Sequence, residues 1–151
     1  MSFEQWLRNG WLQQDETTVA EIQRLLQVAD RDLADAGAAG LSADGRFQHA
    51  YDAALQLCLI ALRAAGYRVR KGQGHHKYGI DSLRHTLGEQ CADTADHIER
   101  CSRLRAQAVY ERIGVVSDED AKDLIDTARQ LRTDVINWLR AHHSEFLPPG
   151  V

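Results

Sequence analysis

Apolar residues recur at intervals of three and four along most of the chain, the period of an α-helix with one buried face. After a short segment at residues 3–12, this pattern predicts five main helices, at residues 17–36, 42–65, 76–87, 91–112 and 117–143. No window alternates apolar and polar residues as a strand does. The only prolines, Pro148 and Pro149, lie in the tail and interrupt no helix. The sequence therefore predicts an all-α protein.

Residues typical of helix ends support these boundaries. Ser42 is a suitable N-cap for the second helix, and Gly66 follows its end. The run Ser117–Asp120 predicts a capping box with acidic residues at the positive end of the helix dipole.

The helix predicted over residues 42–65 is apolar around nearly its whole circumference between Ala50 and Ala65. Such a helix is enclosed by neighbouring helices or by a partner chain. Its polar positions form one narrow stripe: His49, Asp52, Gln56 and Arg63. We interpret this stripe as a solvated seam, with a cleft or a dimer interface as the alternatives.

Length and composition indicate one ordinary globular domain. The chain has 151 residues, of which 44% are hydrophobic and 26% charged. We expect a helical domain at residues 1–147 and a flexible tail at residues 148–151. The net charge of −4 argues against a cationic body that grips duplex DNA without specificity.

The cysteines and the N-terminal segment are informative about the compartment. An odd number of cysteines, Cys58, Cys91 and Cys101, without a CxxC pair argues against a disulfide framework and a zinc ribbon. Cys58 lies in an apolar run and is expected in the core. The first residues do not resemble a signal peptide, and the most apolar window is too short to span a bilayer. We therefore expect a cytoplasmic protein that does not contact a membrane.

A basic loop joins the second and third predicted helices. Between Arg63 and Lys77 there are five lysines and arginines and no acidic residue. The glycines of the loop permit close backbone approach, and its cations attract phosphate. The candidate anion-binding or nucleic-acid-binding residues of this loop are Arg68, Arg70, Lys71, His75, His76 and Lys77. The same composition is also typical of a solvated loop.

A second basic cluster lies on the fourth predicted helix and comprises Arg100, Arg103, Arg105 and Arg112. Arg103 and Tyr110 are two helical turns apart and share a face with Arg100, whereas Arg105 points elsewhere. This face is a candidate phosphate site, with a charge-compensating surface patch as the alternative. No sequence motif indicates a metal site or a cofactor, because HExxH, ExxH, GxSxG and Walker patterns are all missing.

Three stretches together resemble the HEPN (higher eukaryotes and prokaryotes nucleotide-binding) superfamily, in its short stand-alone bacterial and archaeal branch. RFQHAYDAALQLCLIALRAAGYR resembles the branch's AYxA helix with its glycine turn, and KGQGHHKYGIDSL resembles its basic loop. The third stretch, CSRLRAQAVYERIGVVSDEDAKDLIDTARQLRTDVINWL, resembles its RxxRxxAxY segment and long final helix. The resemblance implies an up-and-down helical bundle and a homodimer with a cleft between its subunits.

The resemblance also implies two kinds of activity. Family members include metal-independent ribonuclease toxins, and others are partners of small nucleotidyltransferases. In the toxins an arginine precedes a histidine by a few residues, and the two act on phosphate and on the 2′-hydroxyl. Here Arg103 or Arg105 is followed by Tyr110, which is a poor general base at neutral pH. An Arg70–His75 pair has the spacing but lies in a different loop.

Three hypotheses follow. The favoured one is a HEPN-like module that binds RNA, a nucleotide or a partner protein such as a nucleotidyltransferase or an antitoxin. The second is a metal-independent endoribonuclease, with Arg103 and Arg105 holding phosphate and His75 or Tyr110 moving protons. The third is a structural dimer, built through the apolar second helix, that binds no ligand.

Overall fold

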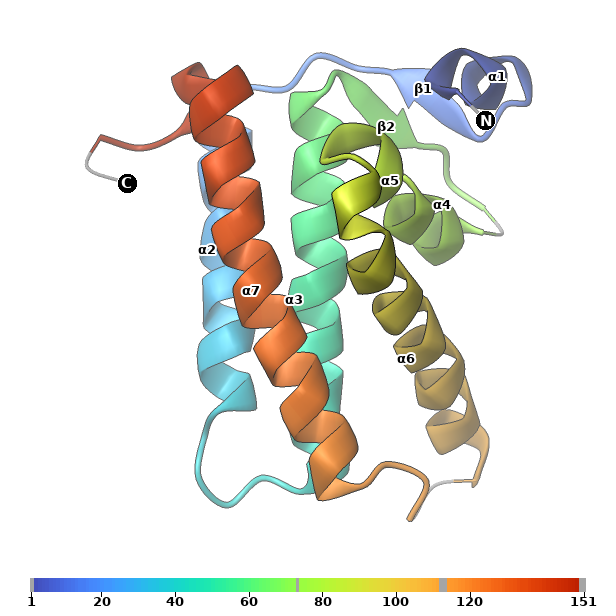
Figure 1. Ribbon diagram of the computed structural model, residues 1–151, viewed down its shortest axis with the longest axis vertical. Helices are drawn as coiled ribbons and strands as arrows, with labels where there is room; N and C mark the ends of the chain where they lie inside the picture. Colours follow the sequence, from blue (N-terminus) through green and yellow to red (C-terminus); the bar gives the residue numbers. More distant parts are fainter. Residues whose placement is uncertain (1, 73, 112–113, 150–151) are drawn as a thin grey trace.

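The computed structural model describes residues 2–72, 74–111 and 114–149. The elements in chain order are α1 (Phe3–Arg8), β1 (Leu12–Gln14), α2 (Val19–Ala36), α3 (Ala43–Ala64), β2 (Tyr67–Val69), α4 (His75–Asp81), α5 (Leu83–Thr86), α6 (Ala92–Glu111) and α7 (Asp118–His142). Two 3₁₀ turns, Glu89–Cys91 and Ser144–Phe146, precede α6 and follow α7. The predicted all-α helical bundle is confirmed, and its four long helices alternate in direction (Figure 1).

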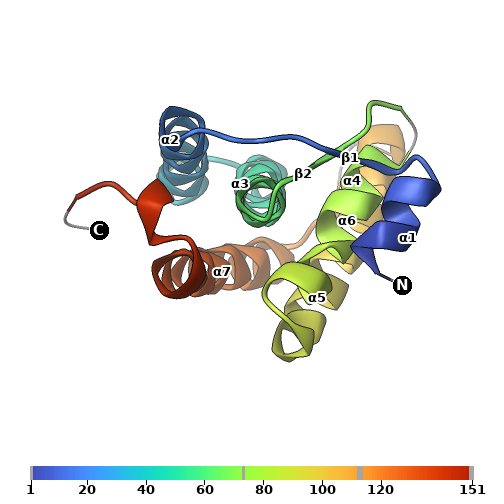
Figure 2. The ribbon, with the colours of Figure 1, turned by 90° about the horizontal axis from the view of Figure 1, so that it is seen from above.

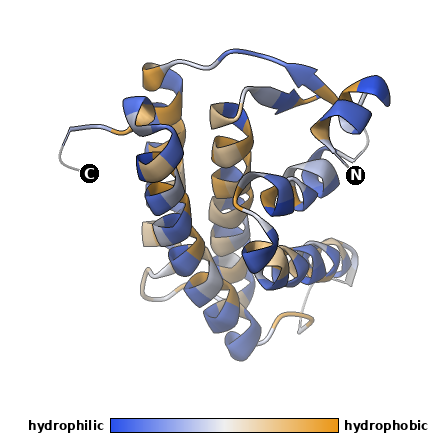
Figure 3. Ribbon diagram, turned by 45° about the horizontal axis from the view of Figure 1, so that its top comes forward, coloured by the Kyte–Doolittle hydropathy of each residue, from blue (hydrophilic) through white to orange (hydrophobic). Residues whose placement is uncertain are grey.

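Helix α3 is the centre of the bundle. Viewed from above, α2 and α7 lie on one side of α3, and α4, α5 and α6 lie on the other (Figure 2). In Figure 3, α3 is hydrophobic along most of its length, whereas α7 presents many hydrophilic positions. Nearly every residue from Ala50 to Ala64 is buried. The apolar circumference of α3 is therefore covered by helices of its own chain and needs no partner chain.

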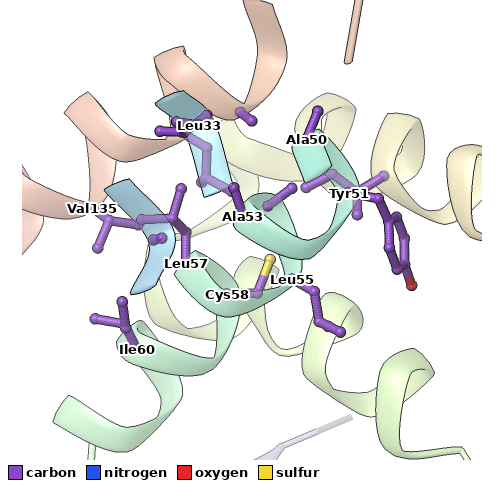
Figure 4. Close-up of a cluster of buried hydrophobic side chains, with 14 of the residues drawn as sticks. Leu33, Ala50, Tyr51, Ala53, Leu55, Leu57, Cys58, Ile60 and Val135 are labelled. Carbon is purple, nitrogen blue, oxygen red and sulfur yellow. The ribbon is translucent and has the colours of Figure 1, made fainter. Parts of the chain in front are cut away.

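Helix α3 packs against different helices on its two sides. Figure 4 shows Leu57 directed toward Leu33 of α2 and Val135 of α7, while Tyr51 and Leu55 point to the opposite side. Leu57, Val135 and Tyr51 are fully buried. The side of Leu57 packs α3 against α2 and α7, and the side of Tyr51 and Leu55 packs it against α4, α5 and α6.

The predicted helix ends are confirmed where capping chemistry marks them. The Ser42 hydroxyl accepts a hydrogen bond from the Gly45 amide at 3.0 Å, and α3 begins at the next residue. Ser117 and Asp120 form the predicted capping box at the start of α7. Helix α2 starts two residues later than predicted, because Thr18 is its N-cap.

The helix predicted over residues 76–87 is divided in two. The break between α4 and α5 lies at Ser82, which is fully buried and whose hydroxyl donates to the Gly79 carbonyl at 2.6 Å. Gly79 lies so close to α3 that a Cβ atom built on it would be 2.9 Å from Leu59 Cδ2. The apolar period does not show this break because it arises from packing against α3. The predicted end of the next helix, Arg112, lies outside the described residues.

The all-α bundle also contains one small sheet, for which no window of the sequence shows an alternating pattern. Strands β1 and β2 pair antiparallel, with Leu12 opposite Val69. Each strand has three residues, which is too short for alternation to be visible in the sequence. Leu12 and Val69 pack with Trp6 and Leu62 in a small second core, which attaches the N-terminal segment to the start of the basic loop.

The remaining expectations concern thiols, membranes and the tail. Cys58, Cys91 and Cys101 are all buried free thiols, which confirms Cys58 as a core residue. Within the described chain, no helix has the length and hydropathy needed to cross a bilayer. Of the expected flexible tail, Gly150 and Val151 lie outside the described residues.

Candidate functional site

The first cations of the basic loop are paired with two acidic residues, Asp15 before α2 and Glu21 in its first turn. Arg68 Nε lies 2.8 Å from Asp15 Oδ2, and Arg63 Nη1 lies 3.2 Å from the same oxygen. Arg63 also donates to Glu21. Arg63 is buried, so the stripe predicted as a solvated seam ends at a buried arginine that is paired with partly exposed carboxylates. Arg68, predicted to bind anions, is occupied by a carboxylate.

Three other cations of the basic loop are exposed. Arg70, Lys71 and Lys77 have no carboxylate within ion-pair distance in the described residues. The Arg70 amide donates to the Trp11 carbonyl at 3.0 Å, which anchors the base of the loop. Lys77 lies 5.9 Å from the ring centroid of Tyr78. These side chains are available to a ligand.

The face of α6 that carries Arg100, Arg103 and Tyr110 is its solvent face. Arg103 pairs with Glu99 at 2.9 Å, one turn earlier on the same helix. Tyr110 is 87% exposed, and Arg100 is also exposed. Nothing in the described chain holds Tyr110 against a basic residue, so this face is an open surface rather than a formed site.

Arg105 projects from the other face of α6, toward α3. Its guanidinium lies 5.2 Å from the ring centroid of Tyr51, and its Nε donates to Gln48 Oε1 at 3.1 Å. Arg105 is partly buried, yet no carboxylate lies within ion-pair distance of it among the side chains that the structure describes, those of residues 2–72, 74–110 and 114–149. It also lines a cavity of about 170 Å³ between α3 and α6.

His76, from the N-terminal turn of α4, joins Arg105 around the same tyrosine. The Tyr51 hydroxyl and His76 Nδ1 are 2.9 Å apart. We call Tyr51, His76 and Arg105 the Arg105 cluster. It unites α3, α4 and α6 at the point where the basic loop enters α4, so that residues far apart in the sequence meet on one side of the bundle (Figures 1 and 2).

Burial sets the protonation states of His76 and Tyr51. The pKa of His76 is lowered by burial first, and then by the positive charge of Arg105. Burial raises the pKa of Tyr51. At pH 7 the imidazole is therefore neutral and the phenol protonated. When His76 Nδ1–H donates to the tyrosine oxygen, Nε2 carries a lone pair that can accept a proton.

The charge of Arg105 gives His76 a testable titration. In wild-type protein, we expect the His76 ring to titrate below its ordinary pKa of 6.5, measured by NMR of its carbon-bound ring protons. In Arg105→Gln the midpoint rises toward 6.5 but stays below it, because burial is the larger cause. Identical midpoints in the two proteins would contradict the electrostatic coupling of these side chains.

His75, which precedes His76 in the sequence, lies outside the Arg105 cluster. It lines a cavity of about 200 Å³ with Leu25, Leu59, Glu21 and Arg68. Of the predicted catalytic candidates, the structure thus separates Arg103, Tyr110 and His75 from Arg105. Tyr51 was missed as a site residue, since its only sequence signal is its place in the AYDA segment.

Comparisons of this chain with models of protein families, with curated proteins and with solved structures give no match.

Proposed function

We propose that the protein is a helical module that binds the phosphate groups of RNA or of a nucleotide at the Arg105 cluster. The observation that carries this proposal is a partly buried guanidinium with no acidic partner in the described residues. Charged groups removed from water are normally paired. Arg105 uses one N–H to bond Gln48, which leaves the Nη donors for the oxygens of a phosphate.

The surroundings of Arg105 support an anionic ligand. His76 presents a neutral imidazole beside it, and the exposed Lys77 follows in the chain. Arg70 and Lys71 lie on the loop that leads into α4. The proposal also draws on the resemblance to the HEPN superfamily. That resemblance implies a homodimer and, as protein partner, a small nucleotidyltransferase or an antitoxin.

The test is the affinity for a labelled single-stranded RNA oligonucleotide, measured at low salt in the presence of EDTA. Arg105→Gln should weaken binding roughly 10-fold or more, because a charge-assisted contact to phosphate contributes about 1.5–3 kcal/mol. Arg103→Gln is the matched control on the same helix, since Arg103 is exposed and paired with Glu99. It should change the affinity less than about 3-fold.

Two outcomes would refute the proposal: wild-type protein that does not bind RNA, or an Arg105→Gln variant that binds as tightly as wild type. Equal losses in both variants would reduce the interaction to diffuse charge attraction and would also contradict a site at Arg105. Circular dichroism of each variant establishes that the helices are intact.

A second candidate function, a metal-independent endoribonuclease, is favoured by the bond between Tyr51 and His76 beside Arg105. His76 Nε2 would accept the 2′-hydroxyl proton while Arg105 stabilises charge on the phosphate. Cleavage of the same RNA in EDTA, lost in His76→Gln but retained in His75→Gln, would support this function. Binding of the RNA without its cleavage would support the binding module.

The third hypothesis, a ligand-free dimer built through the apolar helix, loses the observation on which it rested. Helix α3 is buried by α2, α7 and the shorter helices of its own chain. A homodimer must therefore use another surface, and the proposed RNA site does not depend on it.

A further inference from the structure

A second group of donor side chains lies between α2 and α3, away from the Arg105 cluster. Asp32 and Asp35 are three residues apart on α2, so their side chains share a face. His49 projects from α3 toward them. One carboxylate oxygen from each aspartate and one ring nitrogen of His49 all lie within 4.8 Å of one another. Three potential metal ligands from two helices therefore converge.

Asp32 is buried, but its negative charge is only weakly compensated by a basic residue. Its side chain is only 9% exposed, and its partner is the neighbouring Arg31, at 3.4 Å, whose side chain is 66% exposed. In the described chain, His49 forms no ion pair with Asp32 or Asp35. A buried carboxylate beside a second carboxylate is unfavourable unless a cation neutralises the pair. The three donors thus converge without bonding to one another.

We propose that Asp32, Asp35 and His49 bind a Zn²⁺ ion that links α2 to α3. An imidazole with two carboxylates is a donor set that suits Zn²⁺, whereas Mg²⁺ and Ca²⁺ prefer oxygen ligands throughout. Zinc bonds of about 2.0–2.2 Å place its ligands roughly 3–4 Å apart. Binding would require the donor atoms, now within 4.8 Å of one another, to approach to that distance by rotation of the half-buried Asp35 and His49 side chains, with water completing the coordination.

The position of this site indicates a structural role. Helices α2 and α3 are joined by residues 37–42, and the three ligands lie near that connection. The ligands are close together only when the two helices are packed. An ion bound here therefore stabilises the folded chain. The site uses none of the residues of the Arg105 cluster, so the two proposals stand or fall separately.

The experiment is calorimetric titration of chelator-treated protein with ZnCl₂, combined with thermal unfolding. We expect one equivalent bound and a Tm increase of roughly 5–10 °C when free Zn²⁺ is about a hundred times the Kd. MgCl₂ at the same concentration should leave Tm unchanged. The His49→Ala variant should lose both the binding heat and the Tm increase.

His143→Ala is the matched control, because it removes an imidazole that lies 3.8 Å from the carboxylate of Glu145, at the end of the chain. It should bind Zn²⁺ as wild type does. Asp35→Asn is a second loss-of-binding variant that keeps the size of the side chain, and it tests the site even where His49→Ala perturbs folding. Retained binding in Asp35→Asn, or binding abolished by His143→Ala, would overturn the proposal.

Discussion

We expect Leu57→Ala to lower the free energy of unfolding by about 2–5 kcal/mol, among the largest effects of any single substitution in this chain. Leu57 is fully buried on the face of α3 that meets Leu33 and Val135 (Figure 4). Three long helices enclose the side chain, so they cannot collapse into the space that its loss creates. Urea denaturation followed by circular dichroism measures the change, and Tm should fall by roughly 5–15 °C.

Leu41→Ala is the matched control for this prediction. Leu41 is 39% exposed and precedes the N-cap of α3, so the same chemical change should cost less than about 1 kcal/mol. A similar loss of stability in the two variants would show that α3 is not the centre of the core. A loss in Leu57→Ala below about 1 kcal/mol would contradict the burial seen here.

The features predictable from the sequence are those that neighbouring residues determine. The apolar period locates the long helices, and the hydroxyls of Ser42 and Ser117 locate two of their starts. The break at Ser82 and the pairing of Leu12 with Val69 were not predictable. Both depend on contacts with residues distant in the sequence, which a local pattern does not contain.

The candidate site also depends on contacts between residues distant in the sequence, and it was therefore predictable only in part. The basic loop and the arginines of α6 were recognisable as clusters of charge. Which arginine is free for a ligand depends on where the acidic residues lie in space. Arg68 is paired with Asp15, whereas Arg105 has no carboxylate partner among the described side chains. Tyr51 and His76 are 25 residues apart, a separation that corresponds to no motif.

The first cations of the basic loop are used in ion pairs within the chain. Asp15, between β1 and α2, and Glu21, in the first turn of α2, pair with Arg63 near the C-terminal end of α3 and with Arg68 of β2. This network fixes the point at which the chain leaves α3 and enters β2. The positive charge that remains for a ligand begins at Arg70, beyond the network.

Replacement of Arg63 by methionine should lower the free energy of unfolding by about 2–3 kcal/mol. The Arg63 side chain is 9% exposed, and its removal leaves Asp15 and Glu21 without their buried partner. The cost is below the 3–5 kcal/mol typical of a wholly buried pair, because both carboxylates are partly exposed and Arg68 still contacts Asp15 at 2.8 Å. Arg68→Met, at a side chain 45% exposed, is the control and should cost less than about 1 kcal/mol.

The pH dependence of the difference in free energy of unfolding between wild type and Arg63→Met identifies the cause of that difference. The hydrogen bond from Thr17, followed by the one from Arg63, lowers the pKa of Glu21 below its ordinary value of 4.5. Glu21 therefore stabilises the folded state fully above pH 4.5, and this contribution disappears as the pH falls through the lowered pKa. In Arg63→Met the pKa of Glu21 returns toward 4.5, so the stability gap between wild type and variant should narrow as the medium is acidified below that value. A gap that stays constant from pH 7 to strongly acidic conditions would mean that Arg63 acts through the packing of its alkyl chain, and not through the ion pair.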